Sequence, residues 1–146
     1  MKSPLSLILL DVDHFKSFND RHGHLGGDDC LKKIGNLLKC FAKRPGDLCA
    51  RFGGDEFALI LGNTDMESSA QMAHGLLAAI REVNTAQAPS AVVTASLGVA
   101  TMYPSDDLSE KTLVELADQA LYGAKDNGRN IVFFNKERAP QGYCTK

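Results

Sequence analysis

Two carboxylates at alternate positions, Asp11 and Asp13, directly follow the apolar run Leu5–Leu10. They could not both face a packed core, but the end of a strand would give them a rigid mount for a divalent metal ion. The structural alternative is an ordinary strand end, where acidic residues are common. This pair therefore indicates a candidate metal site without excluding the simpler interpretation.

A second acidic site lies in the segment Gly53-Gly54-Asp55-Glu56, between two strand-like runs. Its glycines permit a positive φ and a close approach of a ligand to the backbone. The alternative is a hairpin turn with solvated acids. If the flanking strands neighbour the strand before Asp11, the acids of both sites could converge on one or two Mg²⁺ ions. That arrangement suits phosphoryl or nucleotidyl transfer.

Two cations and a polar segment complete the candidate chemistry. Lys125 and Arg129 lie near the end of a predicted helix, where they could bind triphosphate oxygens or simply pair with the helix dipole. Asn19 and Asp28 could together read the edge of guanine, but Asp28 or Asp29 could equally cap a helix. The same polar segment contains Asp20, His24 and Gly27.

The hydrophobic pattern predicts the elements that must position these residues. The predicted strands are Leu5–Leu10, Leu48–Phe52, Phe57–Leu61, Ala91–Met102 and Ile131–Phe134. The predicted helices cover Leu31–Phe41, a segment from a Thr64/Glu67 capping box to Val83, and a segment from Ser109 to a C-terminal Gly128. The resulting order, β-α-β-β-α-β-α-β, is a ferredoxin-like core with an added α-β unit. We therefore predict an α+β fold with a mostly antiparallel central sheet flanked by helices.

The composition limits the class of protein. The 146 residues suffice for one domain, and we treat 1–146 as a single domain with a frayed tail over about 136–146. A hydrophobic content of 44% excludes intrinsic disorder, and a net charge of −2 argues against nucleic-acid or membrane-surface binding. No apolar run approaches the ~18–20 residues of a membrane span. We expect a cytoplasmic protein with buried free thiols at Cys30, Cys40, Cys49 and Cys144, since none of these cysteines shows CxxC spacing.

Five segments, in this order, resemble the GGDEF family of diguanylate cyclases. They are 11–20, 23–28, 51–57, 94–100 and 117–130. The resemblance extends from about Leu7 to Val132 and implies a nucleotidyl cyclase or palm-like fold. It also implies a bacterial signalling enzyme that condenses two GTP into the second messenger cyclic di-GMP and releases pyrophosphate.

The resemblance further implies roles for the acidic residues. Asp11, the backbone carbonyl of Val12 and Asp55 would bind the catalytic metal, with two Mg²⁺ or Mn²⁺ ions in each active site. Glu56 would add a metal contact or help deprotonate the attacking 3′-hydroxyl. Asp13 would be a supporting acid rather than a direct metal ligand.

By the same resemblance, other residues would bind GTP or the product. The GTP-binding set is Asn19 and Asp28 at the guanine, the backbone of Phe15 and Lys16 at the phosphates, Gly53 and Gly54 beside the substrate, and Lys125 and Arg129 at the outer phosphates. Arg44 and Asp47 match the family's RxxD motif, an inhibitory site for cyclic di-GMP. An ordinary turn that ends a helix is the alternative for this pair.

Each domain would hold one GTP, so catalysis would require a homodimer with two-fold symmetry. Family members usually carry the pattern Asp-x-Leu-Thr-x-Leu-x-Asn-Arg before the first strand. That pattern is absent here, so we expect a domain that is short at its N-terminus, belongs to a larger sensor protein and is weakly active alone. The alternatives are a GGDEF domain that binds GTP or cyclic di-GMP without turnover, a related nucleotidyl cyclase or polymerase, and a ferredoxin-like interaction domain. The presence of Asp11, Asp55 and Glu56 favours an enzyme.

Overall fold

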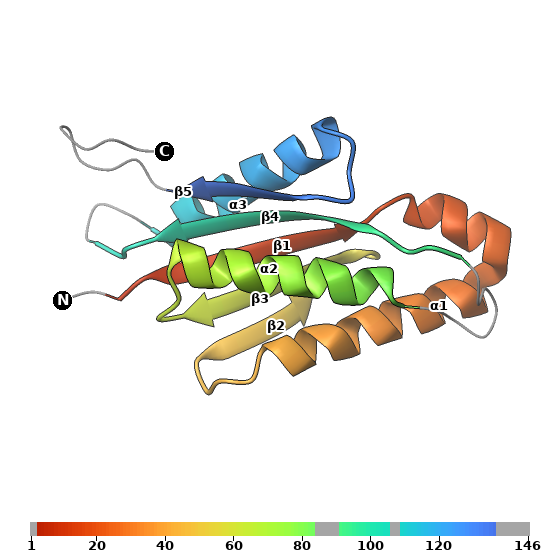
Figure 1. Cartoon of the computed structure of the whole chain (residues 1–146), viewed down its shortest axis with the longest axis horizontal. Helices are drawn as coiled ribbons and strands as arrows, with labels where there is room; N and C mark the ends of the chain where they lie inside the picture. The colour runs from red at the N-terminus through yellow and green to blue at the C-terminus, as the bar shows by residue number, and fades with distance from the viewer. Residues whose placement is uncertain (1–2, 84–90, 106–108, 137–146) are drawn as a thin grey trace.

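The computed structural model describes residues 3–83, 91–105 and 109–136, and its elements follow the predicted order (Figure 1). The strands are β1 (Leu5–Val12), β2 (Asp47–Arg51), β3 (Glu56–Gly62), β4 (Ala95–Met102) and β5 (Val132–Lys136). The helices are α1 (Phe15–Phe41), α2 (Met66–Arg81) and α3 (Glu110–Asp126). From residue 137 onward, the tail predicted to be frayed lies outside the described residues, as does Cys144.

The strands form one sheet in the order β2-β3-β1-β4-β5. β4 and β5 run parallel, and the other neighbouring pairs are antiparallel. The predicted α+β class and mostly antiparallel sheet are therefore confirmed. β1 lies at the centre because its residues are apolar on both faces, from Leu7 to Leu10. A strand of this kind can be buried only between two layers.

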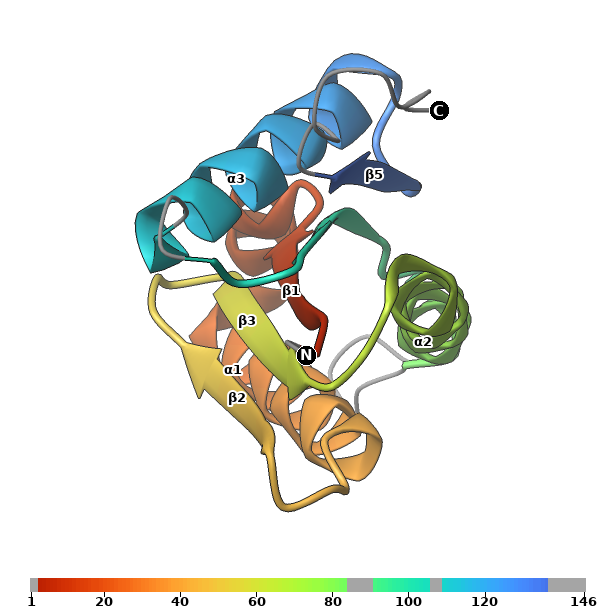
Figure 2. The ribbon, with the colours of Figure 1, turned by 90° about the vertical axis from the view of Figure 1, so that its left-hand side faces the viewer.

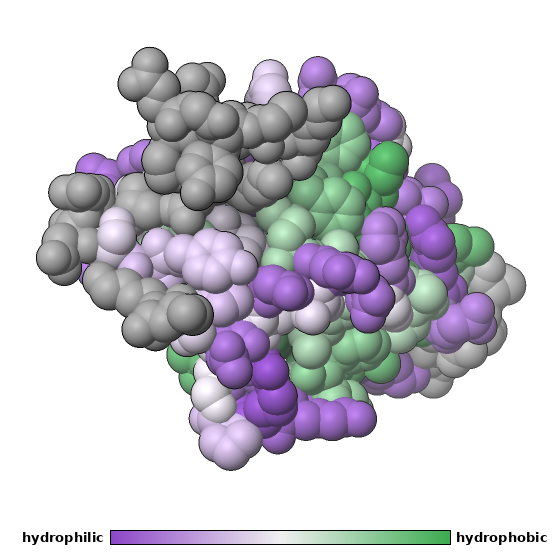
Figure 3. Space-filling model, turned by 60° about the vertical axis from the view of Figure 1, so that its left-hand side comes forward, coloured by the Kyte–Doolittle hydropathy of each residue, from purple (hydrophilic) through white to green (hydrophobic). Residues whose placement is uncertain are grey.

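Helices cover both faces of the sheet, with α1 and α2 on one side and α3 on the other (Figure 2). Alternation along β1 divides the core, because Ile8 and Leu10 face α1 and α2 whereas Leu7 and Leu9 face α3. On the face shown in Figure 3, hydrophobic residues gather near the centre, and hydrophilic residues lie beside and across them. No helix among the described residues is long and apolar enough to cross a membrane.

The first helix starts much earlier than predicted. We expected a helix over Leu31–Phe41, but α1 begins at Phe15 and is kinked at Gly23, whose φ of 81° and ψ of 167° are not helical. A positive φ of this size favours glycine over any side chain. The hydrophobic pattern missed the first half of α1 because it is mostly polar, and its partly buried Phe15 and Phe18 pack on the core. Tertiary packing thus outweighs weak helix propensity here.

Smaller differences concern the ends of elements. The predicted Thr64/Glu67 capping box is wrong by one residue, because Asp65 is the N-cap of α2 and its Oδ1 accepts a hydrogen bond from the Ser68 N–H at 2.8 Å. Asp28 and Asp29 lie inside α1, so neither caps it. β4 begins at Ala95 rather than Ala91.

Other local predictions were correct or partly correct. The β2–β3 hairpin is confirmed, as are the N-cap position of Ser109 and the positive φ of Gly128 after α3. Cys30, Cys40 and Cys49 are free thiols, as expected. However, Cys30 is buried whereas Cys40 is exposed and Cys49 is partly buried, so burial was wrong as a general expectation for these residues.

Replacing Asp65 with Ala is expected to lower the thermal midpoint, because the Ser68 N–H loses its acceptor. This hydrogen bond lowers the pKa of the Asp65 carboxyl. The cap therefore stabilises the fold above the carboxyl's unfolded-state pKa, and the stabilisation is lost as pH falls through the lower folded-state pKa. Thermal melts at neutral and strongly acidic pH check this, with Asp65→Ser as a variant that keeps an acceptor but does not titrate. Equal midpoints for the wild type and Asp65→Ala at neutral pH would contradict the prediction.

Candidate active site

Strand pairing brings the two acidic segments together at one end of the sheet. In the antiparallel register of β1 and β3, Asp11 lies opposite Glu56. One residue further, the Val12 N–H donates to the Asp55 carbonyl at 3.1 Å. The sequence suggested that these strands could be neighbours, and their pairing places the β2–β3 turn beside the end of β1.

The Asp11 carboxylate lies close enough to Asp55 to affect the ionisation of the Asp55 carboxyl. Burial raises the pKa of the Asp55 carboxyl above its usual range, and the neighbouring Asp11 carboxylate raises it further, with a smaller contribution from Glu56. Lys125, from the last turn of α3, forms an ion pair with Asp11. The Asp11 side chain in this pair is 13% exposed, so the contact is partly shielded from water. Two acids and a cation therefore share one small site.

A pocket of about 240 Å³ opens at this point. It is lined by Asp11, Val12, Asp13, His14, Phe15, Lys16, Asp55, Lys125 and Arg129. These residues come from the end of β1, the start of α1, the β2–β3 turn, and the end of α3 with the turn that follows it. The pocket thus unites three of the residues predicted at the metal, Asp11, Val12 and Asp55, with those predicted at the phosphates. Glu56, the glycine pair, Asn19 and Asp28 do not line it.

The donor set of this pocket fits a hard divalent cation. Carboxylate and main-chain oxygens are the ligands that Mg²⁺ prefers, and Asp11 and Asp55 form an adjacent pair that repels unless a cation or a proton compensates it. Lys125 already places a positive charge on Asp11. In the part of the chain that the structure describes, no three His, Cys, Asp or Glu side chains gather closely enough to hold a metal ion. Any metal here would therefore rely on the Asp11–Asp55 pair, main-chain oxygens and ligands from outside the chain.

The glycine turn is shaped by its own neighbours. Neither Gly53 nor Gly54 has the positive φ that the sequence permitted. Gly53 instead leaves room for the Glu56 carboxylate, because a Cβ there would lie 2.8 Å from Glu56 Oε2. The Arg51 guanidinium donates to the Gly54 carbonyl, at 2.7 Å from Nη2 and 3.1 Å from Nε. Arg51 therefore stabilises the turn by hydrogen bonding to its backbone, a role that the sequence alone did not indicate.

The kink at Gly23 brings Asn19 against the second half of α1. The Asn19 and His24 side chains are hydrogen bonded, with 3.1 Å between Nδ2 and Nδ1. A Cβ on Gly27 would lie 2.2 Å from Asn19 Oδ1, so only glycine allows this approach. Asp28 follows Gly27 and is exposed. The two residues predicted to read guanine therefore lie on either side of the kink, next to the turn of helix that contains Gly27.

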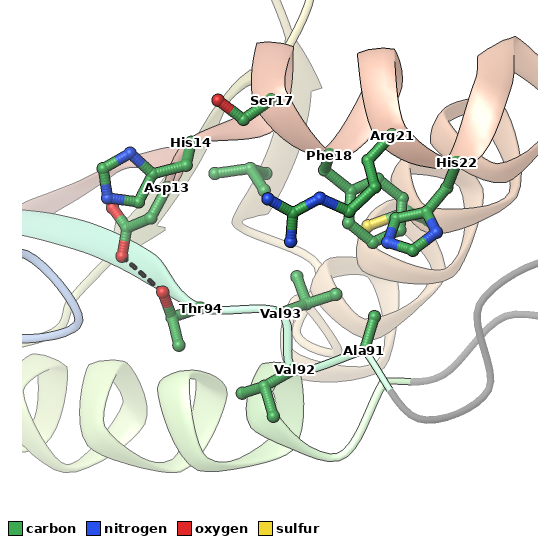
Figure 4. Close-up of a pocket in the computed structure, with 12 residues that line it drawn as sticks. Asp13, His14, Ser17, Phe18, Arg21, His22, Ala91, Val92, Val93 and Thr94 are labelled. Atoms are coloured by element: carbon green, nitrogen blue, oxygen red, sulfur yellow. Dashed lines mark hydrogen bonds between the residues drawn. The ribbon is translucent and has the colours of Figure 1, made fainter.

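Asp13 connects the end of β1 to two other segments. Its carboxylate accepts hydrogen bonds from the Thr94 hydroxyl at 2.7 Å (Figure 4), the Ser96 hydroxyl at 2.6 Å and the Asn130 N–H at 2.9 Å. These bonds link the end of β1 to the segments that contain Thr94, Ser96 and Asn130. This is the kind of supporting role that was predicted for Asp13. In Figure 4 the Arg21 guanidinium points into a second pocket of about 430 Å³, which Asp13 and Thr94 also line.

The predicted product site lies at the opposite end of α1, before β2. Arg44 and Asp47 form an ion pair, with 3.2 Å between Nη2 and Oδ1. Arg44 Nη2 also donates to the Gly62 carbonyl at 2.7 Å and to the Thr64 hydroxyl. The pair thus stabilises the turn between α1 and β2, as the structural alternative predicted, and still leaves the Arg44 side chain about half exposed.

Some residues that support the site were not singled out in the sequence. The hydroxyls of Thr94 and Ser96 alternate before and within β4, a period-two signal that could have been used. Arg81 and Asn130 are also joined, but they are 49 positions apart, and no local pattern links them.

Known proteins resemble this chain in sequence over most of its length. The family model described as "Diguanylate cyclase, GGDEF domain" matches residues 1–131. Diguanylate cyclase A of Treponema denticola is 37% identical over 141 residues, which are 96% of this chain and 38% of that protein. The probable diguanylate cyclase DgcT of Escherichia coli is 37% identical over 90% of this chain and 29% of its own length. The chain thus spans less than two fifths of these curated relatives.

Solved structures show the same fold. The active GGEEF domain of a diguanylate cyclase from Vibrio cholerae matches with a TM-score of 0.83 and 31% identity, over 93% of this chain and 85% of that one. The GGDEF domain of DgcB from Caulobacter crescentus, solved in complex with c-di-GMP, matches with a TM-score of 0.82 and 30% identity, over 90% of this chain and 78% of that one.

Proposed function

This chain belongs to the GGDEF family of diguanylate cyclase domains, and we propose that it condenses two GTP molecules into cyclic di-GMP and two pyrophosphates. One observation carries the proposal: a single pocket joins Asp11 and Asp55 to Lys125 and Arg129. Acids that suit a metal and cations that suit a polyphosphate are the two requirements of nucleotidyl transfer.

The residues of the pocket divide the work between metal and phosphate. Asp11, the Val12 carbonyl and Asp55 would hold a divalent cation, which when bound would neutralise phosphate charge and favour loss of the 3′-hydroxyl proton. The N–H groups of Phe15 and Lys16, at the start of α1, would bind phosphate oxygens.

Two further groups would orient GTP. Lys125 and Arg129 would contact the outer phosphates, where charge-assisted hydrogen bonds are strong. In the unliganded chain Lys125 neutralises Asp11, so nucleotide binding requires it to exchange this partner for phosphate. Asn19 and Asp28 would hold the guanine, beside Gly53 and Gly54, and would thereby favour GTP over ATP.

The bond changes require two domains. Each 3′-oxygen forms a bond to the α-phosphorus of the other nucleotide, and the bond from that phosphorus to the bridging oxygen breaks. Glu56 would accept the proton of the hydroxyl, and pyrophosphate leaves with the electron pair of the broken bond. Because each domain holds one GTP, the productive state would be a dimer with two-fold symmetry.

Incubation of the chain with GTP and Mg²⁺ or Mn²⁺ tests the proposal, with pyrophosphate and cyclic dinucleotide as the products to detect. We expect both products, and a rate per domain that rises with protein concentration because the productive state is a dimer. GTP binding without product would indicate a nucleotide-binding module instead. Equal rates with ATP and GTP would contradict the assignment of Asn19 and Asp28.

We further propose that Arg44 and Asp47 form an inhibitory site for cyclic di-GMP, because half-exposed Arg44 can pair with a phosphate or a guanine. The Asp47 side chain is only 1% exposed, so its part in the site is to hold the Arg44 guanidinium in place. Arg44→Ala is expected to weaken cyclic di-GMP binding about tenfold, the effect of losing hydrogen bonds from a charged donor. Calorimetric titration measures this, with the neighbouring Lys43→Ala as the control for loss of positive charge. Unchanged affinity in Arg44→Ala would leave the pair with only its structural role in the turn.

A further inference from the structure

The turn between α3 and β5 has a backbone that requires support. Gly128, Arg129 and Asn130 all have positive φ, at 103°, 64° and 52°. Glycine adopts such values freely and asparagine tolerates them better than most residues, but the Arg129 side chain disfavours them. A conformation of this kind persists when surrounding contacts hold it in place. Since Arg129 lines the pocket at Asp11, the contacts that hold the turn also determine where its guanidinium lies.

Asn130 receives those contacts from two directions. From the end of β1, the Asp13 carboxylate accepts the Asn130 N–H at 2.9 Å. From α2, Arg81 donates through Nε to Asn130 Oδ1 at 2.8 Å and through Nη2 to the Asn130 carbonyl at 3.1 Å. The Arg81 guanidinium thus donates to both the side chain and the main chain of Asn130. The planar guanidinium can make two such bonds at once, and a lysine ammonium does not reproduce this geometry.

The ends of the turn are fixed as well. The Arg129 N–H donates to the Ala124 carbonyl at 3.0 Å, and the Leu97 N–H donates to the Ile131 carbonyl at 3.0 Å. These bonds anchor the turn to α3 and β4, on either side of Asn130. Asp13 and Arg81 determine the orientation of Asn130, which lies between these two bonds.

We propose that Arg81 is a positioning residue for nucleotide binding and acts through Asn130 on Arg129. Arg81 does not line the pocket of Asp11 and Asp55, and the proposal gives it no contact of its own with the triphosphate. The inference rests on the proposed function, in which Arg129 binds the outer phosphates. A simpler role for Arg81 is a favourable interaction with the C-terminal dipole of α2, where it occupies the last turn.

Binding of 3′-deoxy-GTP in the presence of Mg²⁺ separates these two roles, because this analogue lacks the attacking hydroxyl and is not condensed. We expect Arg81→Met to weaken its binding about tenfold, the loss expected when a binding group is misplaced. Arg81→Lys should weaken it to a similar extent, because an ammonium cannot replace the planar guanidinium. Lys39→Met, which removes a cation from the last turn of α1, is the matched control and should leave the affinity unchanged.

A double-mutant cycle with Arg129→Met gives the decisive comparison. If Arg81 acts through Arg129, adding Arg81→Met to Arg129→Met should weaken binding no further. Additive losses, or an Arg81→Met variant that binds like the wild type, would overturn this inference and leave the proposed function intact. If the wild-type chain does not bind 3′-deoxy-GTP, the proposed function and this inference both fail. Thermal midpoints measured without nucleotide serve as the control that each variant compared is folded.

Discussion

Replacing Asp55 with Asn is expected to reduce cyclic di-GMP formation by about 100-fold or more and at the same time to stabilise the metal-free chain. The loss of activity follows from the proposed metal site, since removing a carboxylate ligand removes several kcal/mol of charge stabilisation. The gain in stability follows from burial and from repulsion by Asp11, which both raise the pKa of the Asp55 carboxyl. Asparagine has a similar shape and carries no charge.

The size of the stability change depends on pH. A carboxyl whose pKa is raised in the folded state binds its proton more tightly there than in the unfolded chain. Its contribution to stability is complete below the unfolded-state pKa and is lost as pH rises through the folded-state pKa. The stability advantage of Asp55→Asn should therefore be present at neutral pH and should shrink as the solution is acidified.

Thermal melts in the presence of a chelator measure this difference, and the GTP condensation assay measures the activity. The matched control is Asp118→Asn, the same substitution at an exposed position on α3. It should change neither activity nor the pH dependence of stability. An active Asp55→Asn variant would exclude Asp55 as a metal ligand. A lower midpoint for Asp55→Asn at neutral pH would contradict the electrostatic account of the Asp11–Asp55 pair.

The second large effect is expected at Gly98, in the middle of β4. A Cβ at this position would lie 2.2 Å from the Leu121 backbone nitrogen and 2.4 Å from the Ala117 carbonyl oxygen. Both atoms belong to the backbone of α3, so no side chain can move aside. Gly98→Ala should therefore displace α3 from the sheet and lower the free energy of unfolding by about 3 kcal/mol or more. Because α3 carries Lys125, phosphate binding should weaken as well.

Chemical denaturation measures the loss of stability, and Gly35→Ala provides the comparison. Gly35 lies within α1, and its added Cβ would meet the Phe57 ring at 3.8 Å, an ordinary contact. The alanine should be neutral or stabilise the helix by about 0.5–1 kcal/mol, because glycine is a poor helix former. If Gly98→Ala unfolds at the same denaturant concentration as the wild type, the close packing of α3 on β4 is wrong.

Much of the sheet could be predicted from the sequence because β1, β3 and β4 are largely apolar. The strands of the β2–β3 hairpin were found to within one residue at each end, since Pro45-Gly46 and Gly53-Gly54 mark its turns. β1 extends two residues beyond its predicted end at Leu10. The first half of α1 was missed for the opposite reason. It is polar, contains Gly23 and has too few apolar residues to show a helical period, so its helix depends on packing against the rest of the molecule.

By itself, the sequence determined the fold class and the residue types of the candidate site. The spacing of apolar residues indicates the helices and strands. The acidic and basic residues of the candidate site lie at the ends of these elements, where their side chains can bind a ligand. Asp11, Asp55, Lys125 and Arg129 could all be proposed from this pattern. Such a local pattern does not contain the distances between residues that are far apart in the chain.

Only the tertiary structure decided how those residues are paired. Lys125 lies 114 positions from Asp11, and their ion pair exists because α3 crosses the sheet beside the end of β1. The link from Arg81 through Asn130 to Asp13 joins three elements in the same way. Many polar side chains of this sequence could pair by charge or hydrogen bonding. The packing of the buried helices and strands determines which of them come into contact.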